Sequence, residues 1–137
     1  LKAFQGYTTS GTGKDLEDAF SWHMKAAQRG HTGAQERIGY MLASGRGTTR
    51  SPNDAFYWLQ KASLGGRSEA QYALGMCYLL GQGYVANPEA AGCWLHEAAR
   101  AGNDRARQQL KRTNLGTDPG PAKPGSPACN FPPFGPS

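Results

Sequence analysis

The sequence predicts an all-α protein, an α/α solenoid in which antiparallel helix pairs stack into a right-handed superhelix. Three observations support this fold class. The chain repeats itself every 36 residues, each repeat has the spacing of amphipathic helices, and glycine recurs where each helix would end. A single helix pair cannot bury its apolar face alone, so we expect stacked copies to share one continuous core.

The repeat is most visible in three tryptophans, Trp22, Trp58 and Trp94, which stand 36 residues apart. Small residues keep the same register, in the columns Ala19, Ala55 and Ala91; Ala26, Ala62 and Ala98; and Gly30, Gly66 and Gly102. Small residues let helices approach closely, and tryptophan fills the space between neighbouring pairs. We therefore expect the tryptophan column in the core, with a ligand cage as the alternative interpretation.

Six helices are expected in order, over residues 15–29, 32–44, 52–65, 68–80, 88–101 and 104–113. Asp15 starts the first of them. Ser51 and Asn87 are expected N-caps, each followed by a proline at the first helical position.

The helices that begin near residues 32 and 68 have a different start signal. Thr32 with Gln35, and Ser68 with Gln71, show the spacing of a capping box. Each pair comes just after a glycine that is expected to end the preceding helix in a left-handed turn.

The stretch SGTGKD at residues 10–15 resembles a phosphate-binding loop, but it does not match the sequence pattern of such a loop. Asp15 follows Lys14 where a Ser or Thr is needed, and Thr8 stands at the first glycine position. In the repeat alignment, Gly11 and Gly13 instead fall in the columns of later glycine pairs, Gly45 with Gly47 and Gly81 with Gly83. We therefore expect a turn between helices, with positive φ at both glycines.

Together these columns resemble the Sel1-like repeat, a relative of the tetratricopeptide repeat. The matching pattern is A-x-x-W-x-x-x-A-A-x-x-G-x-x-x-A-Q-x-x-L-G-x-x-Y-x-x-G-x-G, over about residues 4–113. On this basis we expect one repeat domain at residues 1–115, with two full and two partial copies. The first copy has a connector two residues shorter, and its first helix is missing or reduced to residues 1–4.

From residue 116 onward the composition changes to proline and glycine without helical spacing. An irregular or extended tail is expected over 116–137. The tail is either solvated, or Phe131 and Phe134 dock onto the solenoid or onto a partner.

Charge and hydropathy limit the function classes. The net charge is +5, the mean hydropathy is −0.63, and no apolar run approaches the roughly 20 residues that span a bilayer. Much of the basic excess lies near one end, in Arg100, Arg105, Arg107, Lys111 and Arg112. This cluster is expected to be a solvated helix face, because no aromatic residues interleave it. A polyanion binder is the alternative, and nucleic acid is not an expected partner.

Catalytic and metal-binding patterns are absent from the sequence. Neither S-x-x-K nor K-T-G occurs, and Cys77, Cys93 and Cys129 have no zinc-site spacing. One disulfide with a leftover thiol and three free buried thiols both remain open. His23, His31 and His96 are interpreted as structural positions. We expect no cofactor, no metal and no enzymatic activity.

The resemblance implies that the first helix of each pair lines a concave groove that binds a protein or peptide. The groove columns are Glu36, Tyr40 and Ala43 in one copy, Glu69, Tyr72, Met76 and Leu79 in the next, and Arg105, Gln108 and Arg112 in the last. The apolar members are either an exposed contact site or are buried against adjacent helices.

The function expected from this resemblance is a non-catalytic scaffold or adaptor. Bacterial members of the family are often exported, which implies a periplasmic or secreted protein with a role in the envelope, in host interaction or in neutralising an effector. A cytoplasmic location is the alternative. Some cysteine-rich members have been associated with β-lactam binding, which makes a β-lactam-binding or hydrolase-like protein the alternative function.

Overall fold

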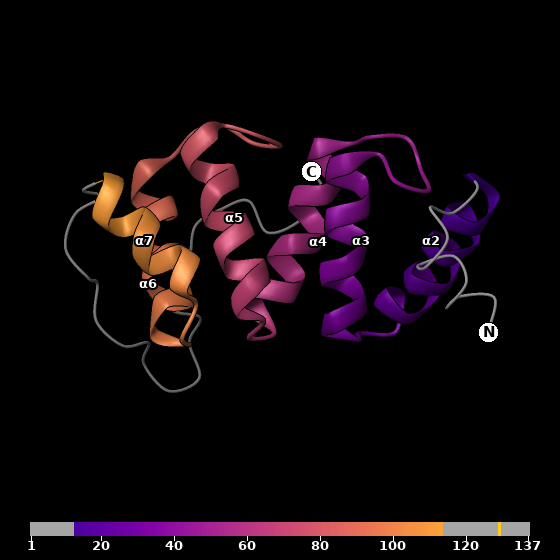
Figure 1. Ribbon diagram of the computed structural model, residues 1–137, viewed down its shortest axis with the longest axis horizontal. Helices are drawn as coiled ribbons and strands as arrows, with labels where there is room; N and C mark the ends of the chain where they lie inside the picture. The colour runs from indigo at the N-terminus through magenta and orange to yellow at the C-terminus, as the bar shows by residue number, and fades with distance from the viewer. Residues whose placement is uncertain (1–12, 114–128, 130–137) are drawn as a thin grey trace.

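A computed structural model describes residues 13–113 and Cys129. This part of the chain forms six helices and no strands: α2 (Gly13–Gln28), α3 (Thr32–Ser44), α4 (Pro52–Leu64), α5 (Ser68–Leu80), α6 (Pro88–Arg100) and α7 (Asp104–Thr113). Figure 1 shows the helices following one another along the long axis, from α2 at one end to α6 and α7 at the other. The all-α solenoid is confirmed.

Within each pair, a glycine on the first helix lets the second helix approach closely. A Cβ added at Gly39 of α3 would lie 2.7 Å from the Leu59 side chain of α4. The same addition at Gly75 of α5 would lie 2.9 Å from Leu95 Cγ of α6. Leu59 and Leu95 are both buried, so in each pair a leucine of the second helix packs directly against a glycine of the first.

The buried glutamines tie each pair to the helix before it. Gln35 Nε2 donates to the Ala27 carbonyl at 3.2 Å, and Gln71 Nε2 donates to the Ser63 carbonyl at the same distance. The expected capping boxes are therefore wrong. The N-cap residues are His31 and Arg67, and neither caps through its side chain. The glutamine amides bind carbonyls at the ends of the preceding helices instead of the N-cap backbone.

The starts of α4 and α6 follow the expected signals in part. Pro52 and Pro88 are first in their helices, and the Asn87 side chain accepts a hydrogen bond from Ala90 N at 3.1 Å. Ser51 is the N-cap residue of α4, but its hydroxyl donates to Asp54 Oδ2 at 3.0 Å and caps no backbone N–H.

The turns after α2, α4 and α6 place Gly30, Gly66 and Gly102 at φ of 95°, 93° and 94°, as the glycine column predicts. The expectation for Gly13 is wrong, since it is the first residue of α2 and has no positive φ. The first connector is two residues shorter than its counterparts, so the second glycine of this pair already belongs to the helix. Gly11 lies outside the described residues.

The three tryptophans are buried to very different extents. Trp94 is 3% exposed and packs with Phe56 of α4 and Tyr78 of α5, whereas Trp58 is half-buried among residues of α2 and α3. Trp22 is 68% exposed, so its expected core position is wrong. Trp58 and Trp94 pack against residues of earlier helices, whereas no described helix precedes α2.

A disulfide joins Cys93 of α6 to Cys129, with the two Cα atoms 5.8 Å apart. Cys129 is 1% exposed and fills the core cluster that contains Phe56 and Trp94. Cys77 is a free thiol. The interpretation of one disulfide with a leftover thiol is thus the one that the structure shows. The remaining tail, including Phe131 and Phe134, lies outside the described residues, as do residues 1–4.

Truncation of the tryptophans should reveal this gradient of burial. Trp94→Ala should lower the free energy of unfolding by about 3–5 kcal/mol, because it leaves a cavity in the core. Trp22→Ala should cost less than about 1 kcal/mol, because its side chain is largely solvated. Urea denaturation followed by circular dichroism measures both losses, and equal losses would contradict the structure.

Removal of the disulfide should destabilise the domain. Cys93→Ala/Cys129→Ala should cost about 2–4 kcal/mol, because the bond closes a loop of 36 residues and restricts the unfolded chain. Thermal melts with and without reductant provide the measurement. Reductant should lower the melting temperature of the wild type and of Cys77→Ala, and leave that of the double variant unchanged.

Candidate partner-binding groove

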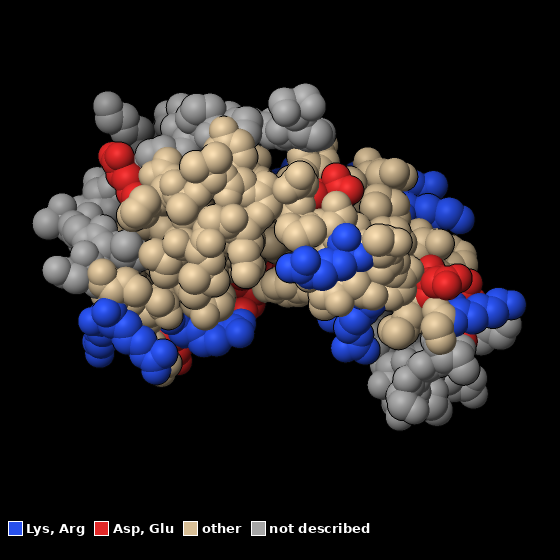
Figure 2. Space-filling model, turned by 90° about the horizontal axis from the view of Figure 1, so that it is seen from above, with Lys and Arg blue, Asp and Glu red and all other residues tan. Residues whose placement is uncertain are grey.

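The described part of the chain is an arc, hollowed along the lower edge in Figure 2. Helices α3, α5 and α7, the first members of their pairs, lie toward the viewer in Figure 1, which is the hollow side in Figure 2. Successive repeats thus present these three helices side by side on one concave face.

Ion pairs connect neighbouring copies across this face. Arg67, at the start of α5, has its Nε 3.3 Å from Glu36 Oε2 of α3. Arg105 of α7 pairs with Glu69 of α5, and Asn103 Nδ2 donates to Glu69 Oε1 at 3.0 Å. Both predicted acids, Glu36 and Glu69, are therefore neutralised by groups of the next repeat.

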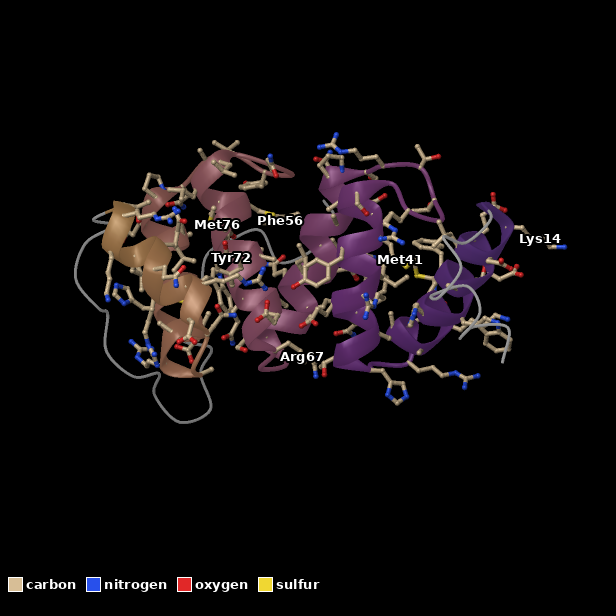
Figure 3. The ribbon with its side chains drawn as sticks, viewed as in Figure 1. Lys14, Met41, Phe56, Arg67, Tyr72 and Met76 are labelled. Carbon is tan, nitrogen blue, oxygen red and sulfur yellow. A yellow bond between two sulfur atoms is a disulfide. The ribbon has the colours of Figure 1, made fainter. Side chains whose placement is uncertain are left out.

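Tyr72 and Met76 form an apolar centre on the concave face (Figure 3). Both are half-buried and pack against the cluster of Leu95, Ala98 and Ala106. The Arg105 guanidinium lies 4.9 Å above the centre of the Tyr72 ring, within cation–π range. One side of each apolar group is therefore held by the core, and the rest remains open to contact.

Tyr40 occupies the same face one copy earlier. It is half-buried against the Leu59, Ala62 and Ala70 cluster. The pKa of the Tyr40 hydroxyl is raised to about 12, mainly by burial and to a smaller extent by the charge of Glu36. Three nearby arginines act in the opposite direction. The phenol is therefore neutral over the physiological range and offers a hydrogen-bonding group at the edge of an apolar surface.

The remaining predicted groove residues do not lie together with Tyr72 and Met76. Leu79 packs against the cluster of Phe56, Tyr78 and Trp94, away from the cluster that holds Tyr72 and Met76. Gln108 and Arg112 lie exposed on α7, as does Ala43 on α3. A role of the predicted set in partner binding stays a prediction.

Sequence reasoning missed two residues that organise this face, Arg67 and Asn103. Both stand directly after a turn glycine, in the same repeat column 36 residues apart, and each reaches back to an acid of the preceding copy. The column was visible in the repeat alignment, but the direction of the side chains was not.

Most of the C-terminal basic cluster is already paired. Arg100 contacts Glu97 at 2.7 Å, Arg107 contacts Asp104 at 3.1 Å, and Arg105 pairs with Glu69. Lys111 and Arg112 are exposed on α7. The charge open to a polyanion is thus smaller than the sequence count indicates.

The described residues offer little chemistry. They contain no group of three or more His, Cys, Asp or Glu placed to hold a metal ion. Burial raises the pKa of the Cys77 thiol to about 11, which leaves it protonated and weakly nucleophilic near neutral pH. Burial, with Arg37 nearby, lowers the pKa of His23. None of the described helices is long and apolar enough to cross a membrane.

This architecture, helix pairs repeated with small residues at the contacts and a concave face, defines an α/α repeat protein. The Sel1 repeat matches residues 4–31, 32–66 and 68–103. The chain belongs to the Sel1 repeat family. Sel1 repeats generally serve as non-catalytic protein–protein interaction scaffolds.

Two solved structures are similar to this chain. A Sel1 repeat protein from Oxalobacter formigenes is 35% identical with a TM-score of 0.67, over 69% of this chain and 71% of that one. The antigen c5321, a protective antigen of uropathogenic Escherichia coli strains with an SLR fold, is 30% identical with a TM-score of 0.69. That match covers 70% of this chain but 21% of the antigen. No curated protein matches the chain significantly in sequence.

The raised pKa of Tyr40 should make stability depend on pH in alkali. The unfolded tyrosine ionises near pH 10, so the unfolded state loses its proton first and stability falls between about pH 10 and pH 12. Tyr40→Phe should remove that part of the fall. Urea melts of both proteins at pH 8 and pH 11 measure the effect. If the difference between them does not change with pH, Tyr40 titrates normally.

Proposed function

We propose that this chain is a non-catalytic scaffold or adaptor that holds a protein or peptide partner along the concave face of α3, α5 and α7. The observation that carries the proposal is the half-buried pair Tyr72 and Met76, with Arg105 stacked on the tyrosine ring. Tyrosine, methionine and arginine are the residue types that protein interfaces favour.

The surroundings of this pair support a contact surface. The side chains are held by the core on one side, so binding would cost little additional conformational entropy. The ion pair of Glu69 with Arg105, whose guanidinium lies over the Tyr72 ring, borders the apolar centre with polar groups. An apolar centre within a polar rim is the usual anatomy of an interface.

We further propose that the protein works outside the cytoplasm, in the envelope, in host interaction or in neutralising an effector. The buried Cys93–Cys129 disulfide supports an oxidising compartment. The similarity to a protective antigen of uropathogenic strains supports a role in host interaction. Polyanion binding is the weaker alternative, because three arginines of the basic cluster are paired. No described feature favours β-lactam binding.

The test replaces the apolar centre of the groove. Tyr72→Ala/Met76→Ala should weaken binding of partners captured from an extract of the source organism by about thirtyfold or more, because the loss of even one hot-spot anchor costs about 2 kcal/mol or more. Isothermal titration calorimetry with the captured partner gives the dissociation constant.

A matched control truncates exposed apolar residues elsewhere. Leu80 and Val85, 59% and 73% exposed, lie at the end of α5 and in the following hairpin. Leu80→Ala/Val85→Ala should leave affinity unchanged. If instead this pair abolishes binding while the groove variant, equally folded by circular dichroism, retains it, the concave face is not the binding surface.

A further inference from the structure

A half-open pocket of about 510 Å³ lies between α2 and α3, at the N-terminal end of the concave face. Its apolar walls are Leu16 and Ala19 from α2, and Tyr40 and Met41 from α3. Figure 3 shows Met41 between the two helices. The volume lies within the roughly 300–1,000 Å³ of typical ligand pockets, so it can accept an apolar side chain from a partner.

Two arginines stand at the rim of this pocket, Arg37 on α3 and Arg46 in the hairpin that follows it. Both are exposed, and neither forms an ion pair with another described residue, unlike Arg67 and Arg105 further along the face. An unpaired guanidinium beside an apolar pocket is suited to a carboxylate, which it can bind through two parallel hydrogen bonds.

The acids near the pocket leave this positive charge in place. Glu36 is next to Arg37 in sequence but pairs with Arg67. Glu17 lines a neighbouring hollow that shares Leu16 and Arg46, without an ion pair to the guanidinium. Glu17 is thus a carboxylate at this edge that would oppose an acidic ligand.

The rim arginines are not part of the recurring repeat design. In the next copy, the columns of Arg37 and Arg46 hold Ala73 and Gln82, and the helix pair and its hairpin form equally well. Since neither arginine is needed to build the repeat, their charge is available for recognition.

We propose that the α2–α3 pocket receives an apolar side chain from an acidic peptide segment of the partner, and that carboxylates flanking this side chain pair with Arg37 and Arg46. The inference rests on the proposed function and specifies the chemistry of the partner. The net charge of +5 favours approach of an acidic segment, and opposite charges at an interface raise both its specificity and its association rate.

The test selects peptides from a random phage library on the full chain. Selected peptides should be rich in Asp and Glu beside Leu, Met or Phe. Selection on Arg37→Glu/Arg46→Glu should return basic peptides, and this variant should bind the acidic peptides about tenfold or more weakly. The control Arg29→Glu/Lys111→Glu makes the same change of charge at exposed sites outside the pocket, and should still select acidic peptides.

A photo-crosslinking amino acid at Ala43, exposed on the pocket rim, identifies the occupant. Adducts with the selected acidic peptide support the proposal. Adducts only with residues 1–12 of the same chain, or only with a second copy, overturn it.

The outcomes also separate the two proposals. If peptides bind Tyr72→Ala/Met76→Ala poorly but bind Arg37→Glu/Arg46→Glu as tightly as the wild type, the groove proposal is supported and the acidic-segment pocket is overturned. If the selected peptides bind both variants as tightly as the wild type, or if no peptide is enriched, both the groove and the pocket are contradicted.

Discussion

The close approach of the two helices in each pair is the constraint on which the rest of the structure depends. It requires Gly39 and Gly75, because a Cβ at either would overlap the leucine of the facing helix. With the pair closed, the first helix is fixed in orientation, and its opposite face is turned outward. Stacking then sets α3, α5 and α7 beside one another, so the concave face is a consequence of packing on the other side of the same helices.

Repeat periodicity predicted the helices well, because the signals that end a helix act locally. The bounds of α3, α5 and α7 are those expected, and the left-handed turns at Gly30, Gly66 and Gly102 follow from glycine alone. Periodicity failed where identical residues meet different neighbours. Trp22 and Trp94 share a column, yet one is exposed and the other buried, because burial depends on which helices stand beside the residue.

The candidate site was less predictable, because its geometry depends on how far side chains reach between copies. Gln35 and Gln71 fit a capping pattern, but their amides bind carbonyls of the preceding helix. Arg67 and Asn103 showed no recognisable motif, yet both bind acids of the copy before. The choice of Cys129 rather than Cys77 as partner of Cys93 is likewise a fact of three-dimensional position.

Comparison of the repeat copies separates the columns that build the fold from the columns that vary on the concave face. The columns that face the partner helix hold the same residue types in the α3–α4 and α5–α6 pairs, such as Gly39 with Gly75, because each pair closes only around them. The concave columns change from copy to copy: Glu36, Tyr72 and Gln108 form one, Tyr40, Met76 and Arg112 another, and Gly33, Glu69 and Arg105 a third. Packing leaves these positions free to vary, so a partner that lies along the face meets a different chemical group at every step. A short array can therefore recognise one partner by an ordered series of contacts, although its framework is built from a single repeated unit.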